Sequence, residues 1–215
     1  MYTLLRVFTS MMLLLGRLFY KVRVEGLENL PQEGPYILSS SETGQMGTML
    51  TMVLIGRLVF SGLMEAPVGF AEEYNWTQGW KEAFSTAGVR PVFPHGRGQA
   101  AWAILAALRS LREGKIVAMN PAGEMSWDGR PVPPNRGVAW LALRSGAPIV
   151  LVVATKGAYE VWPKWAKRPH LTGDFQVRVG QPFRLTDSPC SKVSDEMIAR
   201  ANERVMEETT ALIYH

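Results

Sequence analysis

Apolar and polar residues alternate along this chain in the manner of an α/β domain, in which short apolar strands are separated by amphipathic helices. Val22 and Val24 point the same way on a first short strand. Five further strands are predicted by apolar runs at Tyr36–Ser39, Val68–Ala71, Arg90–Phe93, Lys115–Met119 and Ile149–Val153. The last run is uninterrupted, which is typical of a central strand that is buried on both faces.

Three helices are expected from apolar residues at helical spacing. One starts at about Gly98 and is stopped by Gly114. Its predicted inner face comprises Ala101, Ile104, Leu105, Leu108 and Leu111. The second covers Arg136 to Ser145 and ends at Gly146. The third begins after Ser194, carries acidic residues in its first turn, and is expected to bury Ile198, Ala201, Val205 and Leu212.

No internal repeat or linker divides the rest of the chain, so residues 21–215 are predicted to form one α/β domain with a mixed central sheet flanked by helices. Its 47% hydrophobic and 20% charged residues are an ordinary globular composition. A single cysteine, Cys190, excludes a disulfide framework. The net charge of +4 favours anionic surfaces without identifying one.

Two segments are apolar enough to suggest contact with a membrane. Residues 1–20 hold basic but no acidic side chains, and the apolar run between Arg6 and Arg17 is shorter than the roughly 20 residues that span a bilayer. We therefore predict an N-terminal interfacial or membrane helix, with a helix packed on the core as the alternative. Residues 46–64 are also apolar, but Arg57 lies near their middle, so a buried or interfacial helix is expected there.

The stretch Asn120 to Val153 reads NPAGEMSWDGRPVPPNRGVAWLALRSGAPIVLVV, and VRVEGLENLPQEGPYILSSSETGQMG lies upstream of it. Both stretches resemble sequence blocks of the glycerolipid (lysophosphatidic acid) acyltransferase superfamily. In that family a strand ends in F-P-E-G-T-R-S and is followed by a D-G turn, a K/R-G-x-A helix and a V-P-I-x-P-V strand. The positions that match are Pro121, Gly123, Ser126, Asp128, Gly129, Arg136, Gly137, Ala139, Pro148, Ile149 and Val150.

The resemblance implies a glycerol-3-phosphate acyltransferase-like fold and transfer of an acyl group from a thioester to a hydroxyl. Counted from Gly34-Pro35, Ser41 stands at the family's asparagine position, Glu42 at its histidine and Gly47 at its aspartate. Glu42 is thus the candidate general base in this block. His95, in FPHGRG beside the family's second block, is the other catalytic candidate.

The resemblance also suggests which residues bind the substrate. These candidates are Ser41, Arg97, Pro121, Gly123, Glu124 and Arg136. Met125 and Pro94 stand where the family has arginines that would hold a phosphate on the acceptor, so an unusual acceptor is expected rather than glycerol-3-phosphate or lysophosphatidate. Acyl-CoA or an acyl-carrier-protein thioester is the expected donor. No bound cofactor is expected, and no metal, since no cluster has metal-ligand spacing.

Two classes of function remain open. One is a diverged acyltransferase, and the other is a catalytically inactive protein that binds lipid or serves as a structural subunit of a membrane assembly. The segment WPKWAKRPH, Trp162 to His170, interleaves tryptophans with cations and suits lipid headgroups. An acyl carrier protein, another protein subunit or a sheet edge capped by the tryptophans are the alternatives. We expect a peripheral or monotopic protein on the cytoplasmic face of a membrane, without a nucleic-acid partner.

Overall fold

The computed structural model describes residues 20–41, 67–69, 90–92, 99–122, 126–163, 165–168, 170 and 173–214. The predicted helix in residues 1–20 and the apolar segment 46–64 lie outside this part, apart from Tyr20, which begins the first strand. In the described ranges no helix combines the length and the apolar character needed to cross a membrane.

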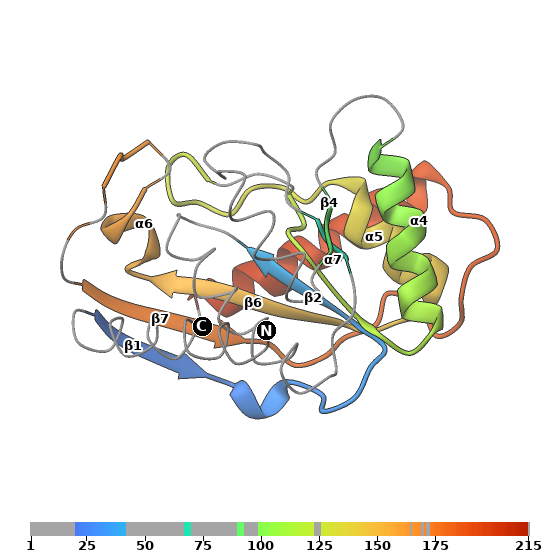
Figure 1. Ribbon diagram of the computed structural model, residues 1–215, viewed down its shortest axis with the longest axis horizontal. Coiled ribbons are helices and arrows are strands. Elements are labelled where there is room, and N and C mark those ends of the chain that lie inside the picture. The colour runs from blue at the N-terminus through green and yellow to red at the C-terminus, as the bar shows by residue number, and fades with distance from the viewer. Residues whose placement is uncertain are drawn as a thin grey trace.

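The described strands form one seven-stranded sheet in the order β1-β7-β6-β2-β5-β3-β4 (Figure 1). Their bounds are β1 Tyr20–Glu25, β2 Tyr36–Ser41, β3 Pro67–Gly69, β4 Arg90–Val92, β5 Ile116–Met119, β6 Ile149–Lys156 and β7 Gly173–Val179. Neighbouring strands run parallel except β6 and β7, which are antiparallel. The predicted mixed sheet is therefore confirmed.

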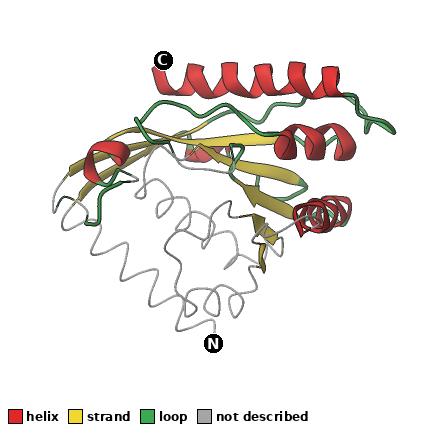
Figure 2. Ribbon diagram, turned by 90° about the horizontal axis from the view of Figure 1, so that it is seen from above, coloured by secondary structure: helices red, strands yellow, loops and turns green. Residues whose placement is uncertain are grey.

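The helical elements in the described part are η1 Leu27–Asn29, α4 Gln99–Arg112, α5 Arg136–Ser145, α6 Ala158–Val161 and α7 Asp195–Tyr214. Helices α4, α5 and α7 contact one another in that order, and α7 also packs on β6. Figure 2 shows α5 and α7 on the same side of the sheet. The bounds of α5 and the start of α7 agree with the sequence prediction, whereas the short helices η1 and α6 were not predicted.

The core is centred on β2, which lies between β5 and β6. All six residues of β2 are buried, as are the first six of β6. Because side chains alternate between the two faces of a strand, a strand without an exposed position must be covered on both faces. The interpretation of the Ile149 strand as a central, doubly buried one is confirmed, and it continues to Lys156.

The predicted inner face of α4 is partly wrong. Ala101 is exposed and Leu105 is 59% exposed, while Leu108 and Leu111 are buried as expected, and so is Ala107. The reason is that α4 lies at the end of the helical layer, where its main contacts within the described part of the chain are with α5, β5 and β3, so that a narrow stripe faces the core.

In α7 the inner face also differs from the prediction at one end. Ile198, Ala201 and Val205 are buried, but Leu212 is only partly buried and packs against the edge of the core, while Thr209 is buried. The Thr209 hydroxyl donates to the backbone oxygen of Val205 at 2.8 Å, so its burial leaves no unpaired donor.

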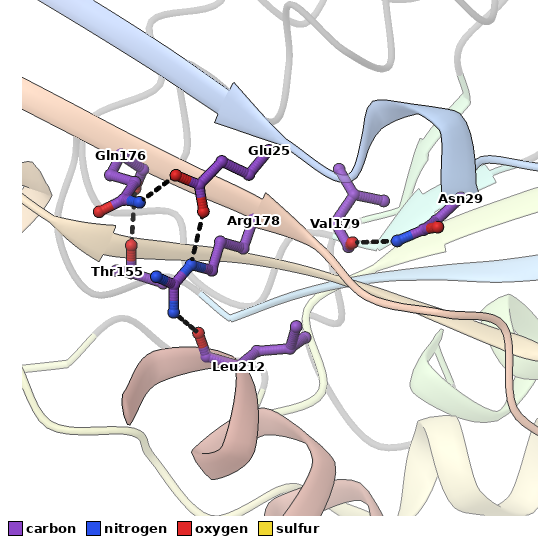
Figure 3. Close-up of polar contacts among 7 residues, drawn as sticks. All are labelled: Glu25, Asn29, Thr155, Gln176, Arg178, Val179 and Leu212. Atoms are coloured by element: carbon purple, nitrogen blue, oxygen red, sulfur yellow. Dashed lines mark hydrogen bonds and ion pairs between the residues drawn. The ribbon is translucent and has the colours of Figure 1, made fainter. Parts of the chain in front are cut away.

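The edge strand β1 is joined to β7 and α7 through one arginine (Figure 3). Glu25 accepts hydrogen bonds from Arg178 Nε at 2.9 Å and from Gln176 Nε2 at 2.6 Å. Arg178 also donates to the backbone oxygen of Leu212 at 3.0 Å, near the carboxyl end of α7, where a cation stabilises the helix. Mainly through the Arg178 hydrogen bond, and next through that of Gln176, the pKa of Glu25 lies below its ordinary value.

Replacing Glu25 by Gln should make stability less sensitive to acid. Because the pKa of Glu25 is lowered in the folded state, its contribution is complete above its ordinary value of 4.5 and is lost as the pH falls through the lowered value. Urea unfolding over a pH series should show a smaller loss of unfolding free energy below pH 4.5 for Glu25→Gln than for wild type. Glu33→Gln, a change at an exposed position nearby, is the control. An equal acid loss in wild type and Glu25→Gln would contradict this.

Two glycines with similar backbone angles should respond differently to alanine. Gly114 has φ +80° and open space where a Cβ would be added, whereas at Gly157, φ +84°, a Cβ would overlap the backbone oxygen of Asp174. Gly114→Ala should therefore cost only the left-handed conformation, about 1 kcal/mol. Gly157→Ala adds a clash with backbone and should cost about 3 kcal/mol or more. Urea unfolding measures the loss of unfolding free energy in both variants, and equal losses would contradict the predicted backbone clash at Gly157.

Candidate functional site

The carboxyl ends of β2 and β5 lie side by side in the sheet. The strands are parallel, with Ser39 opposite Met119, so Ser41 and Pro121 each lie two residues further along. On the other side of β2, Ser41 is opposite Val153 of β6. We call the place where Ser41, Pro121 and Ala122 lie the carboxyl edge. The carboxyl edge thus joins the two stretches that resemble the acyltransferase superfamily, the one that contains Ser41 and the one that begins at Asn120.

Serine side chains occupy the last three positions of β2. Ser39, Ser40 and Ser41 are all buried, and Ser41 is 9% exposed. Within the described ranges the Ser39 hydroxyl has no hydrogen-bond partner. Their burial places hydroxyl groups in the interior of the protein at the end of β2, next to the carboxyl edge.

The chain that leaves β5 is held by two asparagines. Asn120 Oδ1 accepts the backbone N–H of Ala122 at 2.9 Å, which forms a tight turn directly after the strand. Asn135 donates its backbone N–H to Pro121 O at 2.7 Å and its side-chain amide to Ala122 O. Both ends of the 120–135 segment are thus tied together, and Pro121 is fixed at the carboxyl edge.

Asn135 does not cap α5 in the usual way. It occupies the N-cap position, but its side chain makes no capping hydrogen bond, because its amide is directed to Ala122 O. The N-terminal side of α5 is supported from α7 as well, since Asn202 Nδ2 donates to Pro134 O at 3.1 Å. Asn120, Asn135 and Asn202 were not identified from the sequence. The only sequence signal is local, an asparagine directly after a strand and another directly before a helix.

Arg136, one of the predicted substrate-binding residues, is the first residue of α5. Its NH2 group lies 2.6 Å from Asp195 Oδ1 at the start of α7, and both side chains are largely exposed. This ion pair joins the N-terminal ends of two helices, and such exposed pairs contribute little to stability. A role of Arg136 in substrate binding stays a prediction.

The D-G turn of the third block is present in the structure. Asp128 Oδ1 accepts the backbone N–H of Arg130 at 3.0 Å and the Ser126 hydroxyl at 3.2 Å, and Gly129 has φ +81°. These contacts, above all the Arg130 N–H, lower the pKa of Asp128. Asp128 therefore serves to order the turn as a carboxylate.

Of the predicted site residues, Ser41, Pro121 and Arg136 are placed by the structure. Glu42, His95, Arg97, Gly123 and Glu124 lie outside the described residues. Ser41 ends β2 and Pro121 follows the end of the neighbouring parallel strand β5, so both lie at the same edge of the sheet, and Arg136 begins the helix that follows the segment leaving β5. In the described part of the chain no group of three His, Cys, Asp or Glu residues is placed to hold a metal ion.

Comparison with known proteins identifies the family of this chain. Residues 21–155 match the family model described as Acyltransferase, and the chain belongs to that family. It is similar to the chloroplastic 1-acyl-sn-glycerol-3-phosphate acyltransferase of Brassica napus, with 24% identity over 189 residues that cover 83% of this chain and 52% of the relative. The chain thus spans about half the length of that curated relative.

The fold is also that of a solved acyltransferase. The crystal structure of the 1-acyl-sn-glycerophosphate (LPA) acyltransferase PlsC from Thermotoga maritima superposes with a TM-score of 0.67 at 21% identity. The similarity covers 100% of this chain and 80% of that one. The predicted membership in the acyltransferase superfamily is confirmed by the family model and the relatives, and the fold by the structural likeness.

Asn135→Asp tests whether this residue is a clamp or a cap. Aspartate is as good an N-cap as asparagine, and its charge suits a helix N-terminus, so a capping role predicts no loss. The structure instead predicts a loss of about 1 to 2 kcal/mol, because a carboxylate oxygen would face Ala122 O without a hydrogen to donate. Urea unfolding measures the difference, with Asn135→Ala as the reference that removes the side-chain donor without adding charge. A neutral or stabilising Asn135→Asp would contradict the clamp.

Proposed function

We propose that this protein is a diverged acyltransferase that moves an acyl group from a thioester to an acceptor hydroxyl at the carboxyl edge. The observation that carries the proposal is the parallel pairing of β2 and β5, which sets Ser41 and Pro121 at one edge of the sheet. Glu42 follows Ser41 directly in the chain, and Gly123 and Glu124 follow Pro121 and Ala122. The candidate residues of the first and third family blocks therefore follow, within two residues in the chain, the residues that form the carboxyl edge.

In the proposed reaction the acceptor hydroxyl oxygen attacks the thioester carbonyl carbon. The new C–O bond forms, the C–S bond breaks, and the hydroxyl proton passes to a base and then to the departing thiolate. Glu42 is the first candidate base and His95 the second. A glutamate with an ordinary pKa of about 4.3 is a weak base at neutral pH, so burial or a second carboxylate such as Glu124 is needed to raise it.

An unusual acceptor is part of the proposal. Met125 and Pro94 stand where the resembling family has arginines that hold a phosphate, and in the structure Arg136 is engaged with Asp195. An acceptor without a phosphate requires fewer guanidinium groups, which suits this chain. The donor is an acyl-CoA or acyl-carrier-protein thioester, and the reaction takes place at the cytoplasmic face of a membrane.

The second candidate function is a lipid-binding or structural subunit without catalysis. The observation that favours it is the replacement of both members of the family's catalytic pair, by Glu42 and Gly47. A general base contributes about 10² to 10⁴-fold to such reactions, so its loss would leave binding with little turnover. The described carboxyl edge serves either function, because it depends on backbone and asparagine hydrogen bonds rather than on these two positions.

Turnover of an acyl thioester by the purified full chain distinguishes the two functions. We expect slow transfer to a hydroxyl acceptor without phosphate and still less to lysophosphatidate. Glu42→Gln should lower the rate about 10²-fold or more and remove the acidic limb of the pH profile, where protonation of the base slows the reaction. His95→Ala is the parallel variant for the second candidate base, and Glu33→Gln is the matched control at an exposed position.

The outcomes separate cleanly. Rapid transfer to lysophosphatidate would contradict the proposed acceptor. A rate that Glu42→Gln leaves unchanged while His95→Ala abolishes it would assign the base to His95. If the purified protein turned over no donor but still bound an acyl lipid, the proposed acyl transfer would be contradicted. The second candidate function, a lipid-binding subunit without catalysis, would then be supported.

A further inference from the structure

Two tryptophans in the segments that follow β5 and β6 are strongly exposed. Trp127 is 62% and Trp165 is 66% exposed. Trp127 lies in the segment between β5 and α5, and Trp165 lies just after α6, which itself follows β6. In Figure 1 the yellow-green segment that follows β5 passes beside α6. Large aromatic rings are usually packed, so two rings exposed at neighbouring places require a reason.

A tyrosine of α6 connects the two tryptophans. The Tyr159 hydroxyl donates to the backbone oxygen of Trp127 at 2.8 Å and accepts the indole N–H of Trp165 at 3.3 Å. The Tyr159 ring also packs on the backbone of Gly129, where an added Cβ would lie 2.9 Å from Tyr159 Cγ. We call Trp127, Tyr159 and Trp165 the aromatic cluster. Its hydrogen bonds order both segments while the indole rings remain exposed.

A tryptophan of this segment can pack against the protein, as the neighbouring Trp162 does, whereas Trp165 remains exposed. Trp162 is partly buried against a small cluster formed by Ala154, Ala158, Val161 and Phe175, and its indole N–H donates to Ala166 O at 3.0 Å. Trp162 thus packs on residues of β6, α6 and β7, and capping of the sheet edge by tryptophans of this segment stays a prediction. Trp165 lies three residues further on and projects into solvent.

Cations flank the exposed rings. Arg130 lies three residues after Trp127, and Lys167 and Arg168 follow Trp165 closely in the same segment; all three are exposed. Asp128, the acid next to Trp127 in the chain, accepts hydrogen bonds from its own turn and faces Arg130 Nε at 3.8 Å, which offsets its charge. Exposed indoles with interspersed cations match the headgroup region of an anionic bilayer, where rings enter the interface and cations meet phosphates.

We propose that the aromatic cluster docks this protein onto an anionic lipid bilayer, with the rings of Trp127 and Trp165 in the headgroup region. The proposal deepens the proposed function and rests on it in one respect, that the substrate of the carboxyl edge is lipid. The occupant is lipid rather than an acidic protein because the polar atom of the Trp165 indole is already bonded to Tyr159, so that the cluster presents apolar ring surface with cations at its rim.

Partitioning of the full chain between buffer and phosphatidylcholine vesicles containing phosphatidylglycerol tests the proposal. The double variant Trp127→Ala/Trp165→Ala should lower the partition coefficient by about tenfold for each tryptophan, since each removes exposed ring surface that enters the interface. The backbone acceptor of Trp127 survives this change. Tyr214→Ala is the matched control, because Tyr214 is an aromatic of similar exposure, 67%, at the end of α7. It should leave partitioning unchanged.

Two further measurements make the test independent of how well the alanine variant folds. Brominated lipids should quench part of the tryptophan fluorescence of the wild type, and Trp127→Phe and Trp165→Phe should each remove a share of the quenched signal. Lys167→Gln/Arg168→Gln should lower partitioning to anionic vesicles by about tenfold or more and leave uncharged vesicles unaffected.

Wild-type partitioning by the double variant, or an equal loss in Tyr214→Ala, would overturn the proposal. The proposal would also be overturned if the double variant lost binding to a purified acidic acyl carrier protein but kept its partitioning to vesicles. That result would assign the cluster to a protein partner. The test does not depend on catalysis. Turnover of detergent-dispersed substrate should persist in the double variant, whereas failure of the proposed function would appear as absent turnover in the wild type.

Discussion

Everything at the candidate site depends on the parallel pairing of β2 with β5 on one side and β6 on the other. Because β2 is buried along its whole length, its register is fixed by packing on both faces, and a shift by one residue would turn every side chain to the opposite face. The register in turn determines that Ser41 ends opposite Val153 of β6 and at the same edge of the sheet as the end of β5, after which Pro121 follows. A chemical site assembled from distant sequence blocks therefore follows from the burial of apolar side chains.

The segment that leaves β5 is positioned by amides rather than by charged groups. Asn120 shapes the turn, and Asn135 gives up the usual capping hydrogen bond of α5 in order to hold Ala122 O. Arg136, which the family resemblance would assign to substrate, forms a contact with Asp195 that joins α5 to α7. This is consistent with a chain that has lost several charged residues of its family's pattern. The scaffold of the edge does not depend on them.

How much could be predicted depended on whether the signal was local. The limits of α5 and the start of α7 were predicted correctly, because Gly146 and the acidic first turn after Ser194 act within a few residues. The exposure of Leu105 could not be predicted, since it follows from the position of α4 at the end of the helical layer. The role of Asn135 was missed for a similar reason. A side chain before a helix predicts a cap, and only the fold brings Ala122 O close enough to compete.

The candidate site and the aromatic cluster share one segment of chain. It leaves β5 at Asn120, passes Trp127 and the Asp128 turn, and returns to Pro121 O and Ala122 O through Asn135. Tyr159 fixes the middle of this segment to α6, and hence to the end of β6. Asn135 holds the ends of the segment, and Tyr159 holds the backbone at Trp127, so the two anchors use separate hydrogen bonds. In the proposed docking, lipid contact and the candidate site therefore use different parts of one segment, 120–135, and loss of the Trp127 ring leaves the hydrogen bonds at the carboxyl edge in place.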